Sequence, residues 1–228
     1  MYRFRALNLL WILPISWIDA KRLRKKEFST RFSYLQKWCR KVFRAFQVHM
    51  EIELEEKLPE NEPVLFVSNH QSEFDILFLL AALPRPFTFV SKKENSKVPF
   101  VSSWSKTLQL IFFDRDDQNS AIHMLRESAR WLKQGNSLLI FPEGTRSKRK
   151  KMLPMHAGSL QPAFMAKACI VPVVLQNSYD YKQLIKNKKI AYMKILRPIC
   201  FEEYKKLKPE GLKEVLEKRM SEALENKK

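Results

Sequence analysis

The chain has 228 residues, 45% of them hydrophobic, and is long enough to bury one substantial core. Four glycines, no Gly/Ser-rich linker and no internal repeat argue against a second domain boundary between residues 60 and 200. The 42 basic and 24 acidic side chains give a net charge of +18, which favours an anionic partner, either a membrane surface or a nucleic acid.

The N-terminal residues favour the membrane over the nucleic acid. Residues 1–50 mix many Lys and Arg side chains with Trp and Phe, a combination that suits a lipid headgroup zone. Residues 6–18 are apolar but fall short of the roughly 20 residues that span a bilayer as a helix, and Pro14 interrupts them. We therefore expect a re-entrant or interfacial segment. A signal peptide is the competing interpretation, but no small-residue cleavage site follows.

Hydrophobic residues between 21 and 48 recur mostly every three to five positions, which predicts an amphipathic helix with a basic face. Such a helix either lies on anionic lipid or packs on the domain with its basic face in solvent. We expect residues 1–47 to form N-terminal amphipathic membrane-associating helices and residues 48–228 to form the main domain. The protein is then peripheral or monotopic at the cytoplasmic face of the cell membrane, without a nucleic-acid partner.

The main domain alternates apolar runs with helical patterns. The candidate strands are residues 63–69, 137–141, 170–176 and 192–199, and the candidate helices are residues 72–83 and 121–135. This alternation predicts a single α/β domain with a mixed, largely parallel sheet flanked by helices. From Tyr204 onward, apolar residues at helical spacing predict a C-terminal surface helix.

The three cysteines are odd in number and lack CxxC spacing, which indicates neither a disulfide framework nor a zinc ribbon. We interpret Cys169, inside an apolar run, as a small core residue of a protein from a reducing compartment. The four histidines lack HExxH or similar ligand spacing, and GxSxG is absent. These absences disfavour zincin and serine-hydrolase chemistry, and no metal is expected.

His70 and Asp75 have the spacing HxxxxD at a predicted strand-to-helix turn. There the carboxylate can return to the imidazole, keep one ring nitrogen protonated and stabilise the imidazolium. The other nitrogen can accept a proton from an attacking hydroxyl, so the pair predicts a general base. A capping or core role is the alternative for this pattern taken alone.

A glycine loop with the sequence FPEGTRS, residues 141–147, follows the candidate strand at residues 137–141. Arg146 offers a planar fork for phosphate oxygens, and Gly144 lets a substrate approach the backbone closely. The loop therefore suits an anion. The alternative is a plain turn with a solvated arginine.

Together, NHQSxxD and FPEGTRS in this order and at this separation resemble the PlsC-type 1-acylglycerol-3-phosphate acyltransferases of the glycerolipid acyltransferase superfamily. The resemblance extends over about residues 48–200. The family's second block is matched by Lys92-Lys93-Glu94, Pro99 and Phe112 to Arg115. One departure is Ser102, which stands where the family usually has glycine.

The resemblance implies that residues 48–228 form an acyltransferase domain with His70 and Asp75 as the catalytic pair. The reaction would move an acyl group from an acyl thioester to the sn-2 hydroxyl of lysophosphatidic acid, giving phosphatidic acid in phospholipid biosynthesis. No cofactor is implied, and the co-substrate is acyl-CoA or acyl-carrier protein.

The resemblance also assigns residues to the substrate phosphate. Arg115 and Arg146 are expected to bind it, with Lys93 as a further candidate, although its neighbour Lys92 could serve equally. The motif loop itself consists of Glu143, Gly144 and Thr145.

Two arginines match a phosphate monoester better than a choline-capped headgroup, which favours lysophosphatidic acid as the acceptor. The alternatives are an acyltransferase with another acceptor, such as glycerol 3-phosphate or another lysophospholipid, and a non-catalytic basic lipid-binding module. The module would leave His70, Asp75 and the glycine loop unexplained. Donor type, acyl-chain length and oligomeric state are not indicated by the sequence.

Overall fold

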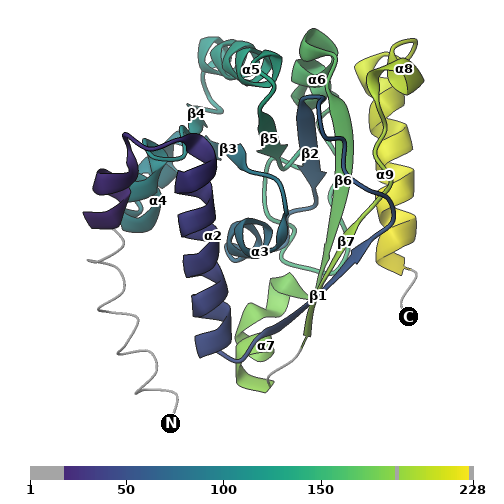
Figure 1. Cartoon of the computed structure of the whole chain (residues 1–228). Coiled ribbons are helices and arrows are strands. Elements are labelled where there is room, and N and C mark those ends of the chain that lie inside the picture. The colour runs from purple at the N-terminus through teal and green to yellow at the C-terminus, as the bar shows by residue number, and fades with distance from the viewer. Residues whose placement is uncertain (1–17, 188–189, 226–228) are drawn as a thin grey trace.

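A computed structural model describes residues 18–187 and 190–225, so the expected re-entrant or interfacial segment at residues 6–18 lies almost entirely outside the described residues. The centre of the domain is a seven-stranded sheet in the order β1-β7-β6-β2-β5-β3-β4 (Figure 1). The strands are β1 (His49–Leu54), β2 (Val64–Ser68), β3 (Phe87–Lys92), β4 (Ile111–Phe113), β5 (Ser137–Ile140), β6 (Cys169–Gln176) and β7 (Ile190–Ile195).

Strands β6, β2, β5, β3 and β4 are parallel to one another, whereas β7 pairs antiparallel with β6 and carries β1 parallel to itself. The predicted mixed, largely parallel sheet is thus confirmed. The helices are α2 (Phe28–Ala45), α3 (Asp75–Ala82), α4 (Pro99–Ser105), α5 (Gln118–Lys133), α6 (Gln161–Ala166), α7 (Tyr181–Asn187), α8 (Phe201–Tyr204) and α9 (Pro209–Glu225).

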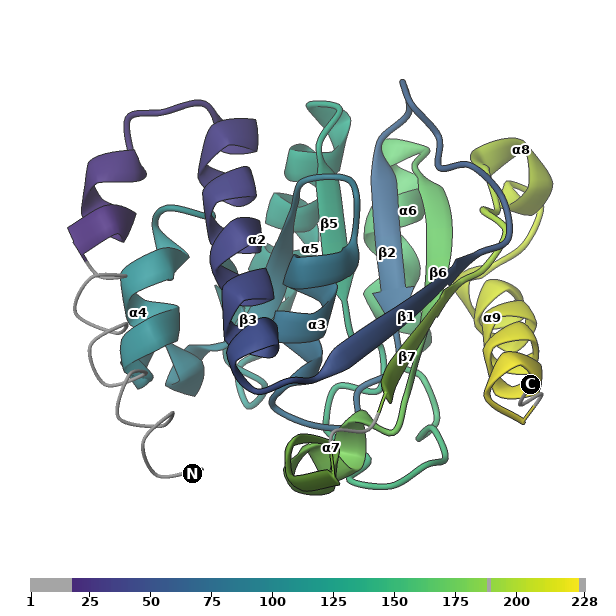
Figure 2. The same cartoon turned by 60° about the horizontal axis from the view of Figure 1, so that its bottom comes forward.

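Helices cover both faces of the sheet, as the continuous apolar runs of its central strands require. Every residue of β2, β5 and β6 is buried. One face packs against α2 and α3 and the other against α5, α6 and α9 (Figures 1 and 2). At the C-terminus, α9 contributes Leu212, Leu216 and Met220 to the second of these layers.

The helix predicted over residues 21–48 is divided in two. Residues 18–23 are helical, and after a break α2 runs from Phe28 to Ala45. The apolar stripe of α2 packs on α3, where the Phe43 and Phe78 rings stack with centroids 4.6 Å apart. Arg40 Nε also donates to the carbonyl of Ala81 at 2.7 Å. The buried stripe of α2 therefore belongs to the domain core.

In the part of the chain that the structure describes, no helix combines the length and the apolar character needed to cross a bilayer. Membrane association of residues 1–47 stays a prediction. The Ser102 departure falls inside α4, where the Ser102 N–H donates to the carbonyl of Val98 at 2.7 Å. A regular helical position needs no glycine.

The expectation of no disulfide, with Cys169 as a free core cysteine, was wrong, because Cys169 and Cys200 form a disulfide. An isolated antiparallel bridge between Ile170 and Ile199 brings the two cysteines side by side. Because 31 residues separate them, no local spacing reveals the pair. Cys169 is nonetheless buried, as expected for its apolar run. Cys39 is a free thiol in the core, and burial raises its pKa to about 12.

Candidate active site

The candidate residues gather where the parallel strands end. His70 follows β2, Lys93 follows β3, Arg115 follows β4 and Glu143 follows β5. Parallel neighbours present their carboxyl ends at one edge of the sheet, which is where α/β domains commonly build a site. Four segments that are distant in sequence thereby meet at one edge.

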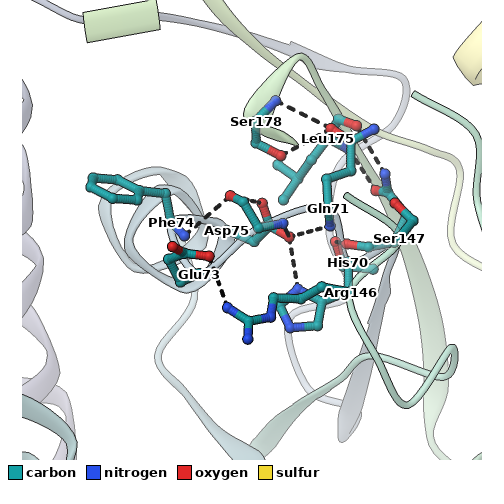
Figure 3. Close-up of polar contacts among 12 residues, drawn as sticks. His70, Gln71, Glu73, Phe74, Asp75, Arg146, Ser147, Leu175 and Ser178 are labelled. Carbon is teal, nitrogen blue, oxygen red and sulfur yellow. Dashed lines mark hydrogen bonds and ion pairs between the residues drawn. The ribbon is translucent and has the colours of Figure 1, made fainter. Parts of the chain in front are cut away.

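His70 and Asp75 form a close pair in which Nδ1 lies 2.7 Å from Oδ2 (Figure 3). The Asp75 side chain is fully buried and also accepts hydrogen bonds from the backbone N–H of Gln71 at 2.5 Å and from Ser72 N at 2.9 Å. Asp75 is the first residue of α3, where the helix dipole favours a negative charge. The imidazole is 21% exposed, so its Nε2 edge can meet a substrate.

The ring plane of His70 is fixed by Phe141, whose ring stacks on it at 4.1 Å and 19°. Phe141 is the first residue of the FPEGTRS segment, two positions before the motif loop. The Glu143 carboxylate accepts hydrogen bonds from the His70 backbone N–H at 2.6 Å and from the Leu153 N–H at 2.7 Å. Burial raises the pKa of Glu143, although the Leu153 and His70 donors act in the opposite direction. Glu143 thus links the turn that carries His70 to the motif loop by a hydrogen bond.

Gln71, an unassigned position of the HxxxxD motif, joins three segments that the sequence could not bring together. Its Oε1 accepts the N–H and the hydroxyl of Ser178 at 3.1 and 3.0 Å, and its Nε2 donates to the Lys150 carbonyl at 3.2 Å. The neighbouring carbonyl of His70 accepts the Ser147 N–H at 2.8 Å. Hydrogen bonds from His70 and Gln71 to residues 147, 150 and 178 therefore fix the position of the turn that carries His70.

Arg146 makes an ion pair with Glu73, with Nη1 2.8 Å from Oε2 (Figure 3). Glu73 also accepts the Tyr181 hydroxyl at 3.1 Å. Burial acts to raise the pKa of Glu73, but its hydrogen bonds and Arg146 hold it below the usual value. The side chains are 44% and 55% exposed, and such a pair is worth only about 0–1 kcal/mol, so a ligand can exchange with Glu73.

Arg115 lies against the motif loop, with Nη2 3.9 Å from the position that a Cβ would occupy on Gly144. Partial burial lowers the pKa of Arg115, and the carboxylates of Glu94 and Asp116 oppose this shift. Lys93, 71% exposed, is 3.6 Å from the carboxylate of Asp114. Arg115 is therefore next to the loop, whereas Lys93 already has a partner.

The other two residues of the motif loop complete its geometry. Gly144 has φ +66°, a conformation that favours glycine, and its N–H donates to the Phe141 carbonyl at 3.0 Å. Thr145 is exposed beside it. The absence of a side chain at Gly144 lets the His156 and Arg115 side chains approach the loop.

A hollow elsewhere on the domain is a different feature. It has a volume of about 440 Å³ and lies between β4 and α5, where His123, Glu127 and Trp131 line it. None of the candidate site residues lines it. The hollow therefore has no part in the candidate site.

Comparison with known proteins agrees with the family resemblance that the sequence motifs indicate. The model of the Acyltransferase family matches residues 49–176. A "1-acyl-sn-glycerol-3-phosphate acyltransferase" of Chlamydomonas reinhardtii is 38% identical over 118 residues, which are 51% of this chain and 35% of that protein. One of Helicobacter pylori is 34% identical over 142 residues, covering 61% of this chain and 59% of that protein.

The human "1-acyl-sn-glycerol-3-phosphate acyltransferase alpha" is 31% identical over 137 residues, 60% of this chain and 48% of that protein. The chain thus spans about half the length of these curated relatives. The solved "1-acyl-sn-glycerophosphate (LPA) acyltransferase, PlsC" of Thermotoga maritima has a TM-score of 0.74, with 97% of this chain and 96% of that chain covered. Because the two sequences are 23% identical, this structural likeness shows a shared fold and nothing more.

Proposed function

Because this chain belongs to the acyltransferase family, we propose that it transfers an acyl group from an acyl thioester to the sn-2 hydroxyl of lysophosphatidic acid, giving phosphatidic acid for phospholipid biosynthesis. The observation that carries the proposal is the His70–Asp75 pair, 2.7 Å apart and braced against a loop lined by Arg115. The acceptor named for the relatives supports this choice of acceptor.

In the proposed mechanism His70 is the general base. With Nδ1 hydrogen-bonded to Asp75, Nε2 takes the proton of the sn-2 hydroxyl while its oxygen attacks the thioester carbonyl carbon. Asp75 stabilises the imidazolium that forms. When the tetrahedral intermediate collapses, the C–S bond breaks and the imidazolium returns the proton to the leaving thiolate. The products are the ester and a free thiol.

We assign the acceptor's phosphate to Arg115 and Arg146, with Lys93 as a weaker contributor because Asp114 already neutralises part of its charge. Both arginines are near Gly144: Arg146 follows it by two residues, and Arg115 Nη2 lies 3.9 Å from the position of a Cβ on it. The direct test is thioester release by the purified protein with lysophosphatidic acid as acceptor. Glycerol 3-phosphate and a choline-capped lysophospholipid are the comparison acceptors, and faster turnover of either would refute the assigned acceptor.

Replacing either arginine with alanine should weaken use of the acceptor. A hydrogen bond to a charged group is worth about 1.5–3 kcal/mol, so Arg115→Ala or Arg146→Ala should lower kcat/KM for lysophosphatidic acid by roughly 10- to 150-fold. The KM for the acyl donor should change little. Steady-state kinetics with each substrate varied in turn measure both effects.

Glu73→Gln is the matched control for Arg146, since it removes the partner of the arginine and keeps the arginine itself. An exposed pair contributes about 0–1 kcal/mol, so this variant should stay within about fivefold of the wild type. If folded Arg146→Ala has an unchanged kcat/KM for lysophosphatidic acid, Arg146 does not bind the phosphate.

The positive charge near the site suits an anionic co-substrate. Residues 148–151 are four consecutive Lys and Arg residues, all exposed, on the loop that Gln71 and Glu143 tie to the His70 turn. Both acyl-CoA and acyl-carrier protein are acidic thioester carriers, so this loop fits either donor. We leave both as donors, to be separated by kinetics with each.

We further propose that the protein works at the cytoplasmic face of a membrane as a peripheral or monotopic protein held by its N-terminal residues. Reversing three exposed charges, Arg24→Glu, Lys25→Glu and Lys26→Glu, should sharply reduce sedimentation with anionic vesicles, since each basic residue contributes roughly 1 kcal/mol at such a surface. High salt should weaken wild-type binding only in part, because salt screens charges and not buried apolar side chains.

The control is the same charge change elsewhere, Lys205→Glu, Lys206→Glu and Lys208→Glu, just beyond α8 and far from α2 (Figure 1). This triple variant should sediment with vesicles like the wild type. Equal sedimentation of both triple variants would show that the N-terminal charges do not contribute to membrane binding.

A further inference from the structure

His156 is a histidine that the proposed mechanism does not use, and it lies against the motif loop. A Cβ placed on Gly144 would be 3.3 Å from His156 Cδ2 and 3.5 Å from Nε2. The same Cβ would be 3.9 Å from Arg115 Nη2. The imidazole and the guanidinium therefore both lie close to Gly144, and the imidazole can approach so closely because residue 144 has no side chain.

The backbone holds His156 firmly in this place. Its N–H donates to the Pro142 carbonyl at 2.9 Å, and its carbonyl accepts the Ser159 N–H at 3.0 Å and the Ser159 hydroxyl at 2.6 Å. His156 is thus attached to the motif loop one residue before Glu143, the carboxylate that braces the His70 turn. The hydrogen bond to Pro142 therefore keeps the His156 backbone next to the motif loop.

Among the residues that the structure describes, the His156 side chain has no partner. It is exposed, and its ring makes no hydrogen bond or ion pair with any residue that the structure describes. An imidazole that is positioned by its backbone and left unpaired is available to a ligand. With a proton on Nε2, in either its neutral or its charged form, it can donate a hydrogen bond into the space beside Gly144.

The charges beside Gly144 select the ligand. Arg115 carries a full positive charge near His156, and a planar guanidinium is suited to the oxygens of a phosphate. The nearby carboxylates of Glu94 and Asp116 act on Arg115 but leave it without a hydrogen-bonded partner among the described residues. Arg146, by contrast, is engaged by Glu73 and must exchange partners before it can bind an anion.

We propose that His156, together with Arg115, binds the phosphate monoester of the acyl acceptor beside Gly144. This inference rests on the proposed function, because it names a further residue of the same acceptor site. Arg115 and His156 can bind the phosphate without first breaking an ion pair. Arg146 can bind it only after its ion pair with Glu73 has broken.

The first test is kinetic. His156→Ala should raise the KM for lysophosphatidic acid by about 10- to 150-fold, the range for a hydrogen bond to a charged group, with kcat within about twofold of the wild type. The KM for the acyl donor should not move. His156→Lys, which restores a donor and a positive charge, should recover most of the loss. His123→Ala, at an equally exposed histidine on α5, should leave all constants unchanged.

The second test needs no turnover. In the full-length wild-type protein, inorganic phosphate should shift the imidazole NMR signals of His156 and leave those of His123 in place, and Arg115→Ala should weaken this response. If the wild type acylates lysophosphatidic acid while phosphate leaves His156 unshifted and His156→Ala keeps its KM, the inference is wrong and the proposed function stands. If phosphate shifts His156 in a protein that does not acylate lysophosphatidic acid, the anion site stands and the proposed acceptor is wrong.

Discussion

His70→Ala is expected to lower kcat for acyl transfer to lysophosphatidic acid by about 10²- to 10⁴-fold, the usual contribution of a general base. The variant should fold. The His70 ring is at the edge of the site, stacked on Phe141, and its loss leaves Asp75 with its other donors from Gln71 and Ser72. No buried carboxylate is left without a hydrogen bond. Thioester release measures the rate, and circular dichroism with thermal melting checks the fold.

His123→Ala provides the matched control here as well, since it removes an imidazole outside the candidate site. Its rate should equal that of the wild type. Vesicle binding should be the same in all three proteins, because neither histidine belongs to the N-terminal segment. Wild-type acyl transfer by folded His70→Ala would show that the central assignment is wrong.

The fold could be predicted where a strand is a continuous apolar run. β2, β5 and β6 are such runs and are buried on both faces, so composition alone indicated them. The edge strands β1 and β4 were not predicted. In β1 every residue is at least partly exposed, and β4 has only three residues, too few to give a period. Their pairing depends on neighbours that only the tertiary structure supplies.

The amphipathic pattern of α2 shows why periodicity alone cannot identify a partner. The stripe that includes Phe43 is apolar in the same way whether it meets lipid or protein, and a basic opposite face suits either case. What decides the question is the contact between Phe43 and Phe78 and the bond from Arg40 to Ala81. These contacts link α2 to α3, about 40 residues away in the chain.

The candidate site likewise has a part that the sequence predicts and a part that it does not. The HxxxxD pair was predictable, because His70 and Asp75 are five residues apart and a single turn brings them together. Contacts such as Arg146 with Glu73 and Gln71 with Ser178 join segments that are 73 and 107 residues apart. Their partners are ordinary polar residues without a motif, so no local pattern marks them. The same holds for His156, whose position beside Gly144 follows from a backbone bond to Pro142.

Asp75→Asn is expected to be nearly as severe as the loss of His70, at about 10²- to 10⁴-fold in kcat. The amide can be accommodated: its oxygen can take the place of Oδ2, which accepts from Gln71 and Ser72, while its NH₂ group faces the Ser72 hydroxyl. A neutral amide cannot stabilise the imidazolium of His70, so the base loses its driving force while the fold is retained. Rates and melting temperatures of purified protein measure the two effects separately.

The double variant, His70→Ala with Asp75→Asn, tests whether the two residues act as one unit. If Asp75 works only through His70, the double variant should be about as slow as His70→Ala alone, far from the product of the two single losses. Asp75→Asn would then be nearly silent in the His70→Ala background. Multiplying losses would mean that Asp75 contributes to catalysis or folding by a route that does not pass through the 2.7 Å bond to His70.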